Sequence, residues 1–448
     1  MLLRPPEGVW TRCWWRRASA FWCWYVTWPI FVGWWPARKA PGTAEYPRPV
    51  ISLTDARAYV LDRCPGPVTA EVPLAEARGL ATSVAVEAPE AVPPFANSAM
   101  DGFAVRASDT VGAPVELRVV GTVAAGSVPD VEVSPGCAVR IMTGAPLPVG
   151  ADAVVMVERT QSVGGGDAVV VEVEVPEGNH LRTIGEDLQP GDQVFSVGTV
   201  LGPGHLGVLA SIGVDRVAAW RRPRVGVLST GDELVDGVGP LEIGQIRDSN
   251  RPSLLGLLDE MGVTGVDLGR VADDEEAIEV ALRGGVSTCD AVLTSGGVSM
   301  GDFDYVKVVL DRIGDMRWMQ VAIKPAKPLA FGLVDGVPVF GLPGNPVSSM
   351  VSFELFARPA LRAMAGRSDL DRPRVRAIAE DDLRRRTDGK VHFVRVVVST
   401  RDGGTYASSA GGQGSHQLTA MAAATGLAVL PDGNGVAEGD EVEVLLLG

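Results

Sequence analysis

Residues 225–234 read VGVLSTGDEL, residues 291–299 read AVLTSGGVS and residues 337–348 read VPVFGLPGNPVS. Each stretch is a short apolar run that leads directly into a glycine-rich polar turn. Helical patterns separate them, including one at 250–262 that has a proline in its first turn and ends at a glycine. Because strands alternate with helices over residues 223–365, the sequence predicts a mostly parallel sheet covered by helices on both faces.

The three glycine-rich turns are candidate ligand contacts. In an open parallel sheet, ligands bind beyond the carboxyl ends of the strands, where glycine lets backbone amides approach an anion and a following helix N-terminus favours negative charge. We therefore expect all three turns to line one crevice; the alternative is that they are only tight connections. The chain contains neither GxxxxGK[ST] nor GxGxxG, which disfavours a P-loop ATPase and a dinucleotide dehydrogenase.

The regions on either side of this segment favour β-structure. Residues 95–222 contain runs that alternate apolar with polar residues or are β-branched, such as AVVVEVEV at 168–175. Residues 370–448 return to short β-runs and predict a small sandwich or barrel. Ser52 and Asp55 form a helix-start pattern of the S-x-x-D kind, so we expect the folded body to begin there.

Composition excludes several classes of protein. The chain has 448 residues, of which 46% are apolar and 21% charged, so it is too apolar for a disordered protein. A chain of this length holds roughly two to four domains. The net charge of −15 should repel nucleic acid and anionic membrane surfaces, and we expect no nucleic-acid partner. An anionic ligand must therefore be held locally, by backbone amides or a few placed cations.

The first 45 residues differ from the rest of the chain. Eight of the ten tryptophans lie before residue 36, and six basic residues face only two acidic ones. The apolar run at 19–35 is close to the minimum length for a membrane anchor, but Pro29 interrupts it and basic residues flank both ends. Our preferred interpretation is that residues 1–45 lie outside the fold, as with a translation start placed too far upstream; an anchor is the alternative.

The cysteines and lysines are both sparse. The five cysteines show neither CxxC spacing nor clustering, which argues against a zinc site or a disulfide framework and for a reducing compartment, so we expect a cytoplasmic protein. Only five lysines occur, and two of them, Lys324 and Lys327, lie together in IKPAKP. Such a pair between prolines predicts an anion clamp, although a solvated surface pair is the ordinary alternative.

Carboxylates accompany these motifs. Asp232 and Glu233 lie in the first glycine-rich turn, and Asp302 and Asp304 follow the second, where helix capping is the alternative function. Acidic side chains beside an anion site are explained if a hard divalent cation such as Mg²⁺ bridges them to phosphate. Asp101 in SAMDGFA and Asp187 in LRTIGEDL lie in two further turns of the β-rich region.

Together these motifs resemble those of the molybdopterin molybdenumtransferase family, called MoeA in bacteria and the gephyrin E domain in animals. The resemblance covers residues 48–448 and rests on SAMDGFA, LRTIGEDL, STGDEL, the DSN turn at 248–250, TSGGVSMGDFDY, IKPAKP, GLPGNPVS and GGQGSH, in this order. Residues 1–45 have no counterpart in it.

The resemblance implies both an activity and an architecture. The family inserts molybdenum from molybdate into adenylylated molybdopterin with release of AMP, using Mg²⁺ or a similar cation, in the last step of basic molybdenum cofactor biosynthesis. Its subunits are elongated and form homodimers, and molybdopterin adenylyltransferase and molybdoenzyme maturation proteins are possible partners. The implied fold class is α/β plus β, with these parts: a linking domain at 46–94 and 188–222, a β-rich lasso domain at 95–187, a molybdopterin-binding α/β domain at 223–368 and a C-terminal β-barrel at 369–448.

The resemblance also implies roles for individual residues. The acidic, catalytic positions are Asp101, Asp187, Glu233, Asp273 and Asp304, of which Glu233 and Asp304 would hold Mg²⁺. The positions associated with the pterin phosphate or molybdate are Lys324, Lys327, Pro328, Ser348, Arg395 and Ser415. The expected binding turns add Thr230, Gly231, Asp232, Ser249, Asn250, Ser295, Gly296, Gly297, Ser299, Gly344 and Asn345. Asp101 and Asp187 would act on the α/β domain of the partner subunit.

Three positions depart from the family pattern: Phe103 replaces a usual Tyr, Ala326 a usual Gly, and Gln320 stands where Lys is possible. Only the last bears on charge, because it removes one auxiliary cation. Two other functions remain open from the sequence: a gephyrin-like scaffold that clusters other proteins, and a paralogue specialised for tungstate, which nearly matches molybdate in size and charge.

Overall fold

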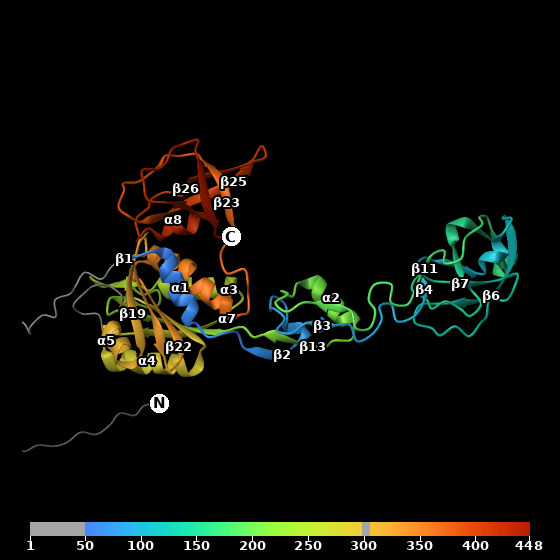
Figure 1. The fold of residues 1–448 in the computed structure, drawn as a ribbon, viewed down its shortest axis with the longest axis horizontal. Coiled ribbons are helices and arrows are strands. Elements are labelled where there is room, and N and C mark those ends of the chain that lie inside the picture. Colours follow the sequence, from blue (N-terminus) through green and yellow to red (C-terminus); the bar gives the residue numbers. More distant parts are fainter. Residues whose placement is uncertain (1–49, 298–304) are drawn as a thin grey trace, which may run out of the picture. The chain divides into compact units, whose positions relative to one another are not determined.

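The computed structural model describes residues 50–297 and 305–448 (Figure 1). The predictions made for residues 1–45, and those for Ser299, Asp302 and Asp304, lie outside these residues. None of the helices in the described part of the chain is both long and apolar enough to cross a membrane.

The α/β domain is built on one seven-stranded mixed sheet. Its central strands β22, β18, β14 and β17 are parallel, whereas β21 pairs antiparallel with both β19 and β22. The parallel core agrees with the expectation from residues 223–365. The strand order is β1 (Val50–Ile51), β19 (Asp315–Val321), β21 (Pro328–Val334), β22 (Val337–Leu342), β18 (Ala291–Ser295), β14 (Arg224–Thr230) and β17 (Thr264–Val271).

Helices cover both faces of this sheet. Along β18 the neighbouring residues Val292 and Leu293 point to opposite faces and enter different apolar clusters, which is why this strand reads as a continuous apolar run. One cluster lies under α4 (Glu275–Thr288) and α5 (Tyr305–Ile313). The other lies under α1 (Leu53–Arg63), α3 (Asn250–Glu260), α6 (Pro346–Ser352) and α7 (Arg358–Met364), the last two joined by a π-helical turn at Phe353–Ala357 (Figure 1).

The first helix lies on the α/β domain, which differs from the predicted domain boundary. Residues 50–63 were expected in the linking domain. Instead β1 pairs in parallel with β19, and Ala56 and Val60 of α1 are buried in the core of the α/β domain. Ser52 caps α1 by accepting from the Asp55 amide at 3.0 Å, as the S-x-x-D pattern predicts.

The linking region has a small core of its own, which contains Leu201, Leu209 and Ile212. Its strands pair antiparallel across the two chain segments that form it. The paired elements are β2 (Thr69–Pro73) with β13 (Arg216–Trp220) and β3 (Val86–Glu87) with β12 (Gln193–Phe195), accompanied by helix α2 (Pro203–Ser211).

Residues 97–182 form a six-stranded sheet with apolar clusters on both of its faces, around Val105 and Val169 on one side and Val139 and Val154 on the other. The strand order is β8 (Ala153–Met156), β5 (Gly102–Val105), β7 (Cys137–Ile141), β6 (Val115–Val123), β10 (Ala168–Val171) and β9 (Thr160–Val163). The short strands β4 (Asn97–Ser98) and β11 (Leu181–Arg182) pair beside it.

The C-terminal region is a closed five-stranded barrel, which resolves the open choice between a sandwich and a barrel. Closure follows from the pairing of β25 with both β26 and β27. Ala377, Val396, Ala428 and Val444 fill the interior. Around the barrel the strands are β25 (Val391–Arg401), β26 (Gly404–Ser409), β23 (Arg374–Ala379), β29 (Glu441–Leu446) and β27 (Gly426–Leu430).

Candidate active site

The three glycine-rich turns lie side by side at one edge of the α/β sheet. Ser229 of β14 pairs with Ser295 of β18, and Ser295 pairs with Leu342 of β22. Since these strands are parallel neighbours, the turns that follow them share the carboxyl edge where open parallel sheets bind ligands. Thr230, Gly231, Ser295, Gly296, Gly297, Gly344 and Asn345, all predicted binding residues, are in these turns or at the strand ends.

Asn250 joins two of the turns. Its side-chain amide donates to Ser295 Oγ at 2.6 Å and to the Gly344 carbonyl at 2.8 Å. The Asp248 carboxylate positions Asn250 by accepting a hydrogen bond from its backbone amide at 3.1 Å. Ser249, which precedes α3, makes no side-chain cap to that helix. The motif DSN at 248–250 thus forms a rigid turn that holds the edge of the site together.

Several buried oxygens at this edge have no hydrogen-bond partner among the described residues, and Thr230 Oγ1 and Asn250 Oδ1 are two of them. Buried polar atoms are almost always hydrogen-bonded, so unpartnered ones mark places where a ligand or water completes the bonding. The crowding is also tight, because a Cβ at Gly296, whose φ is +98°, would lie 2.8 Å from the Thr230 carbonyl oxygen. Glycine is therefore required where the second turn approaches the first.

Carboxylates gather beside the first turn. The Asp273 amide donates to Asp232 Oδ1 at 3.0 Å. Partial burial raises the pKa of Asp273, and the negative charges of Asp232 and Glu233 raise it further. Repulsion of this kind is relieved by a hard cation, and carboxylate oxygens are the donors that Mg²⁺ prefers. Within the described residues no group of three or more Asp, Glu, His or Cys side chains is placed to hold a metal ion, so these carboxylates by themselves do not form a complete metal site.

A groove of about 810 Å³ brings together five further predicted binding residues. Lys324, Lys327, Pro328, Ser348 and Ser415 all line it. Both lysines are exposed, and neither ammonium group has a hydrogen-bond or ion-pair partner in the described part of the chain. Between them Ala326 adopts φ +73°, the left-handed region that favours glycine, which gives a physical reason for the glycine that the family usually carries there.

Arg395 holds one wall of this groove. Its side chain is only 1% exposed, and its Nη2 donates to the carbonyls of Gly412 at 2.6 Å and Gly414 at 3.2 Å. The Val347 amide in turn donates to the Ser415 carbonyl at 3.1 Å, joining the loop to the start of α6. Arg395 is therefore a positioning residue for the loop that carries Ser415.

Models of one protein family match nearly all of the described chain. They are the MoeA N-terminal region (domain I and II) over residues 51–213, a probable molybdopterin binding domain over 226–363 and the MoeA C-terminal region (domain IV) over 376–447. The chain belongs to the MoeA family.

Relatives support this assignment over most of the length. The molybdopterin molybdenumtransferase of Haemophilus influenzae is 39% identical over 399 residues, 88% of this chain and 98% of that protein. Molybdopterin molybdenumtransferase 2 of Mycobacterium tuberculosis is 39% identical over 84% of this chain and 94% of its own. A crystal structure titled as the molybdopterin biosynthesis MoeA protein of Pyrococcus horikoshii covers 89% of this chain and all of that one, with 32% identity and a TM-score of 0.75.

Asp101 and Asp187 lie in the β-rich region of this MoeA chain, apart in sequence from the lysine groove. Asp101 Oδ1 accepts from the Thr143 amide at 2.6 Å and from the Thr143 hydroxyl at 2.8 Å, and these bonds lower the pKa of Asp101. The Asp187 amide donates to the Val92 carbonyl at 2.9 Å, which leaves its exposed carboxylate available. Their approach to a partner subunit stays a prediction.

Other groove residues were not singled out from the sequence. Arg384, Arg386, Lys390 and His392, all from the C-terminal region, line the same groove as the lysine pair. The available signal was the run of three arginines at 384–386 in an acidic chain. No sequence pattern connects this run to residues 324–327, so only the tertiary structure shows that the arginines and the lysine pair line one groove.

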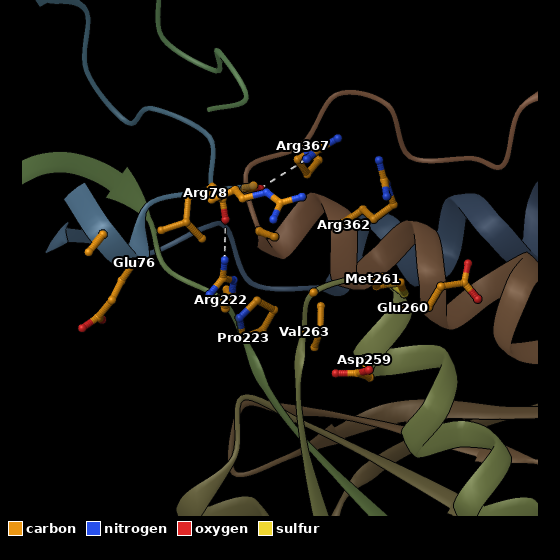
Figure 2. Close-up of a pocket in the computed structure, with 15 residues that line it drawn as sticks. Glu76, Arg78, Arg222, Pro223, Asp259, Glu260, Met261, Val263, Arg362 and Arg367 are labelled. Carbon is orange, nitrogen blue, oxygen red and sulfur yellow. Dashed lines mark hydrogen bonds between the residues drawn. The ribbon is translucent and has the colours of Figure 1, made fainter. Parts of the chain in front are cut away.

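A second cavity of about 730 Å³ contains four arginines but none of the predicted site residues (Figure 2). Arg222 Nη2 donates to the Arg78 carbonyl at 2.5 Å, and Arg367 Nη1 donates to the Gly79 carbonyl at 3.4 Å. Arg362 and Arg367 also pair with Asp369, at 2.5 and 2.8 Å. Helices α3 and α7 end at this cavity, and their carbonyl ends favour cations. Arg222 and Arg367 therefore brace the turn at 78–79.

Proposed function

We propose that this chain is a molybdopterin molybdenumtransferase that inserts molybdenum from molybdate into adenylylated molybdopterin and releases AMP. The observation that carries the proposal is the groove in which Lys324 and Lys327 lie without an ion-pair partner among the described residues. Two exposed cations held close together between prolines form a local positive site that can bind an anion on a chain whose net charge of −15 otherwise repels one. Both substrates are anions, and the named relatives carry this activity in their names.

The chain's own residues would act mainly by binding and orientation. Lys324 and Lys327 neutralise anionic oxygens, and Ser348 and Ser415 at the same groove supply hydroxyl donors. Thr230 Oγ1 and Asn250 Oδ1 complete their hydrogen bonds with the pterin substrate at the sheet edge. Preorganised donors of this kind lower the barrier because they need no rearrangement when charge develops.

We further propose that Mg²⁺ binds at the acidic turn. Glu233 and Asp273 would hold it, with Asp304 as a further ligand. When bound, the ion supplies positive charge that neutralises the phosphoanhydride as AMP leaves. Burial raises the pKa of Asp273 and the charges of Asp232 and Glu233 raise it further, and a divalent cation bound at this turn would offset that charge repulsion.

The active protein is proposed to be a cytoplasmic homodimer in which Asp101 and Asp187 complete the site of the partner subunit. Co-purified mixed dimers test this arrangement. Asp101→Asn and Lys327→Ala subunits are each expected to be inactive alone, whereas their random mixture regains about a quarter of wild-type activity, because half of the dimers carry one intact site. If Asp101 acts within its own subunit, the mixed dimer has no intact site and stays inactive.

The activity itself is tested by incubating the purified chain with adenylylated molybdopterin, Mg²⁺ and molybdate. We expect stoichiometric AMP release and molybdenum bound to the pterin. A parallel reaction with tungstate identifies the preferred oxyanion. Absence of AMP release with either oxyanion would refute the enzymatic function and leave a scaffold function to be tested by pull-down.

A further inference from the structure

Three consecutive arginines with three different environments begin at the last residue of β24 (Leu383–Arg384) and continue into the turn before β25. Arg384 pairs with Asp382 at 2.6 Å on the surface. Arg385 is almost fully buried, with a side chain 2% exposed. Arg386 is exposed, lines the groove, and has no hydrogen-bond or ion-pair partner for its guanidinium among the residues that the structure describes. The same short turn thus leaves one arginine free for a ligand.

Arg385 fixes the backbone of this turn. Its Nη1 donates to the Lys390 carbonyl at 2.6 Å and to the Leu430 carbonyl at 3.0 Å. Its Nη2 donates to Asp388 and Asp432, both at 2.7 Å. Because the neighbouring residue is held by several charge-assisted bonds, the Cα position of Arg386 is set before a ligand arrives, which reduces the entropy lost on binding.

Strand pairing sets the position of the turn relative to the lysine pair. The short strand β20 (Ile323–Lys324) runs parallel to β25, with Lys324 opposite His392. The Val391 amide also donates to the Ala322 carbonyl at 2.9 Å. The C-terminal barrel is therefore bonded through its backbone to the segment that carries Lys324, and the arginine turn precedes this junction by a few residues.

The groove carries more positive charge than its carboxylates neutralise. Its two carboxylates are occupied: Asp382 pairs with Arg384, and Asp388 accepts from Arg385, from Lys390 at 3.2 Å and from His392 at 3.2 Å. Lys324, Lys327 and Arg386 remain uncompensated in the described structure. Burial lowers the pKa of His392, and the positive charges of Arg385 and Lys324 lower it further although Asp388 acts in the opposite direction, as expected for a positive local field.

The size of the groove indicates which substrate this charge serves. Its volume of about 810 Å³ lies in the range that binds organic ligands of drug size, about 300–1,000 Å³, and far exceeds what one tetrahedral oxyanion needs. Lysines act as point charges, whereas the planar fork of an arginine matches two oxygens of one phosphate group. The volume of the groove therefore favours a phosphate ester of an organic substrate over a second free oxyanion, and a free arginine can contact two oxygens of that phosphate.

We propose that Arg386 binds a phosphate group of the adenylylated pterin substrate, so that the C-terminal barrel contributes directly to substrate recognition. This inference rests on the proposed function. It assigns Arg386 to substrate binding and leaves molybdate to the lysines. The barrel thereby forms one wall of the binding site.

Steady-state kinetics of Arg386→Gln, Arg386→Lys and Arg376→Gln test the proposal. Arg376 is a control from the same barrel, with a side chain 83% exposed and no place in the groove. Loss of one bidentate phosphate contact should raise the KM for adenylylated molybdopterin about tenfold in Arg386→Gln, with kcat and the KM for molybdate unchanged. Arg386→Lys should fall between this variant and wild type, and Arg376→Gln should match wild type.

Calorimetric titration with AMP provides a second measurement that needs no turnover. We expect AMP to bind Arg386→Gln about tenfold more weakly than it binds wild type, and Arg376→Gln normally. An unchanged pterin KM with unchanged AMP affinity overturns the inference, as does an effect confined to the molybdate KM. A wild-type protein that releases no AMP from the substrate overturns the proposed function instead, and in that case the titration alone decides the assignment of Arg386.

Discussion

Replacing Gly296 by alanine should damage both the stability and the activity of the α/β domain. Gly296 has φ +98°, a conformation that alanine adopts only with strain. The new Cβ would lie 2.8 Å from the Thr230 carbonyl oxygen and 3.1 Å from Thr230 Oγ1. The first contact is with backbone and has no flexible side chain to yield, so the two glycine-rich turns must separate.

The size of the effect follows from two contributions. Strained backbone at such a φ costs about 1–3 kcal/mol, and overpacking of this kind costs about 1–3 kcal/mol more. We therefore expect the free energy of unfolding to fall by about 2–6 kcal/mol. Because Thr230 and Ser295 lie at the ends of the two separated strands, a displacement approaching 1 Å should lower the transferase rate by about a hundredfold.

Gly336→Ala is the matched control. Gly336 also has a positive φ, +83°, but a Cβ there meets no atom within 4 Å. It belongs to the β21–β22 hairpin of the same sheet. We expect this variant to lose about 1–2 kcal/mol from backbone strain alone and to keep its activity.

Urea unfolding followed by circular dichroism measures the stability of both variants, and AMP release measures their activity. Equal stability losses in Gly296→Ala and Gly336→Ala would show that the contact with Thr230 does not constrain the turns. Full activity in Gly296→Ala would show that the spacing of these turns is not needed for the reaction.

Four further changes have defined outcomes. Lys327→Ala removes an unpaired cation, so AMP release should fall by about 100-fold or more while the thermal melting curve is unchanged; a shifted melt would indicate a structural role. Burial raises the pKa of Asp273 above its ordinary value, so the folded state binds the carboxyl proton of Asp273 more tightly than the unfolded state does. Wild type therefore loses stability as the pH rises through that raised pKa. Asp273→Asn should therefore melt above wild type at pH 7, with the difference vanishing as pH falls below the ordinary carboxyl pKa, and it should need more Mg²⁺ for activity; a lower melting temperature at pH 7 contradicts this. Arg385→Ala should destabilise the barrel by about 2–4 kcal/mol, because it leaves buried acceptors unpaired; a melt like that of wild type would remove the basis for a preformed Arg386. Deletion of residues 1–45 should leave AMP release intact, and a folded truncated protein without activity would show that the segment is needed.

Much of the site was predictable because its polar and charged residues lie in short, local sequence motifs. The turns after residues 229, 295 and 342 were expected to meet, since the alternation of strand and helix over 223–365 implies parallel strands with a common carboxyl edge. The lysine pair in IKPAKP was predicted to be an anion clamp from the scarcity of lysine and the two flanking prolines, and the structure places both lysines in one groove. Ser52 and its helix followed the capping rule.

Other features depend on contacts that local sequence does not encode. The AVVVEVEV run predicted a strand to Val175, but β10 ends at Val171, where its partner strands begin at Val115 and Thr160. Alternation of apolar and polar residues is a property of one segment, whereas the length of a strand also depends on the neighbouring strands that pair with it. In the same way, residues 50–63 follow a capped helix pattern but pack on the α/β sheet, because β19 offers an edge to β1.

The sequence alone determined the family, the order of the domains and the local chemistry of each motif, because strand runs, glycine turns and isolated lysines act over a few residues. Only the tertiary structure decided which distant residues share the groove. Lys324 and His392 are opposite each other through β20 and β25, which brings Arg386 to the lysine pair. Arg395 was expected at the ligand, yet it is enclosed behind the loop that it holds. The sequence does not show whether a given arginine is buried, paired or free, because the packing around its side chain decides this.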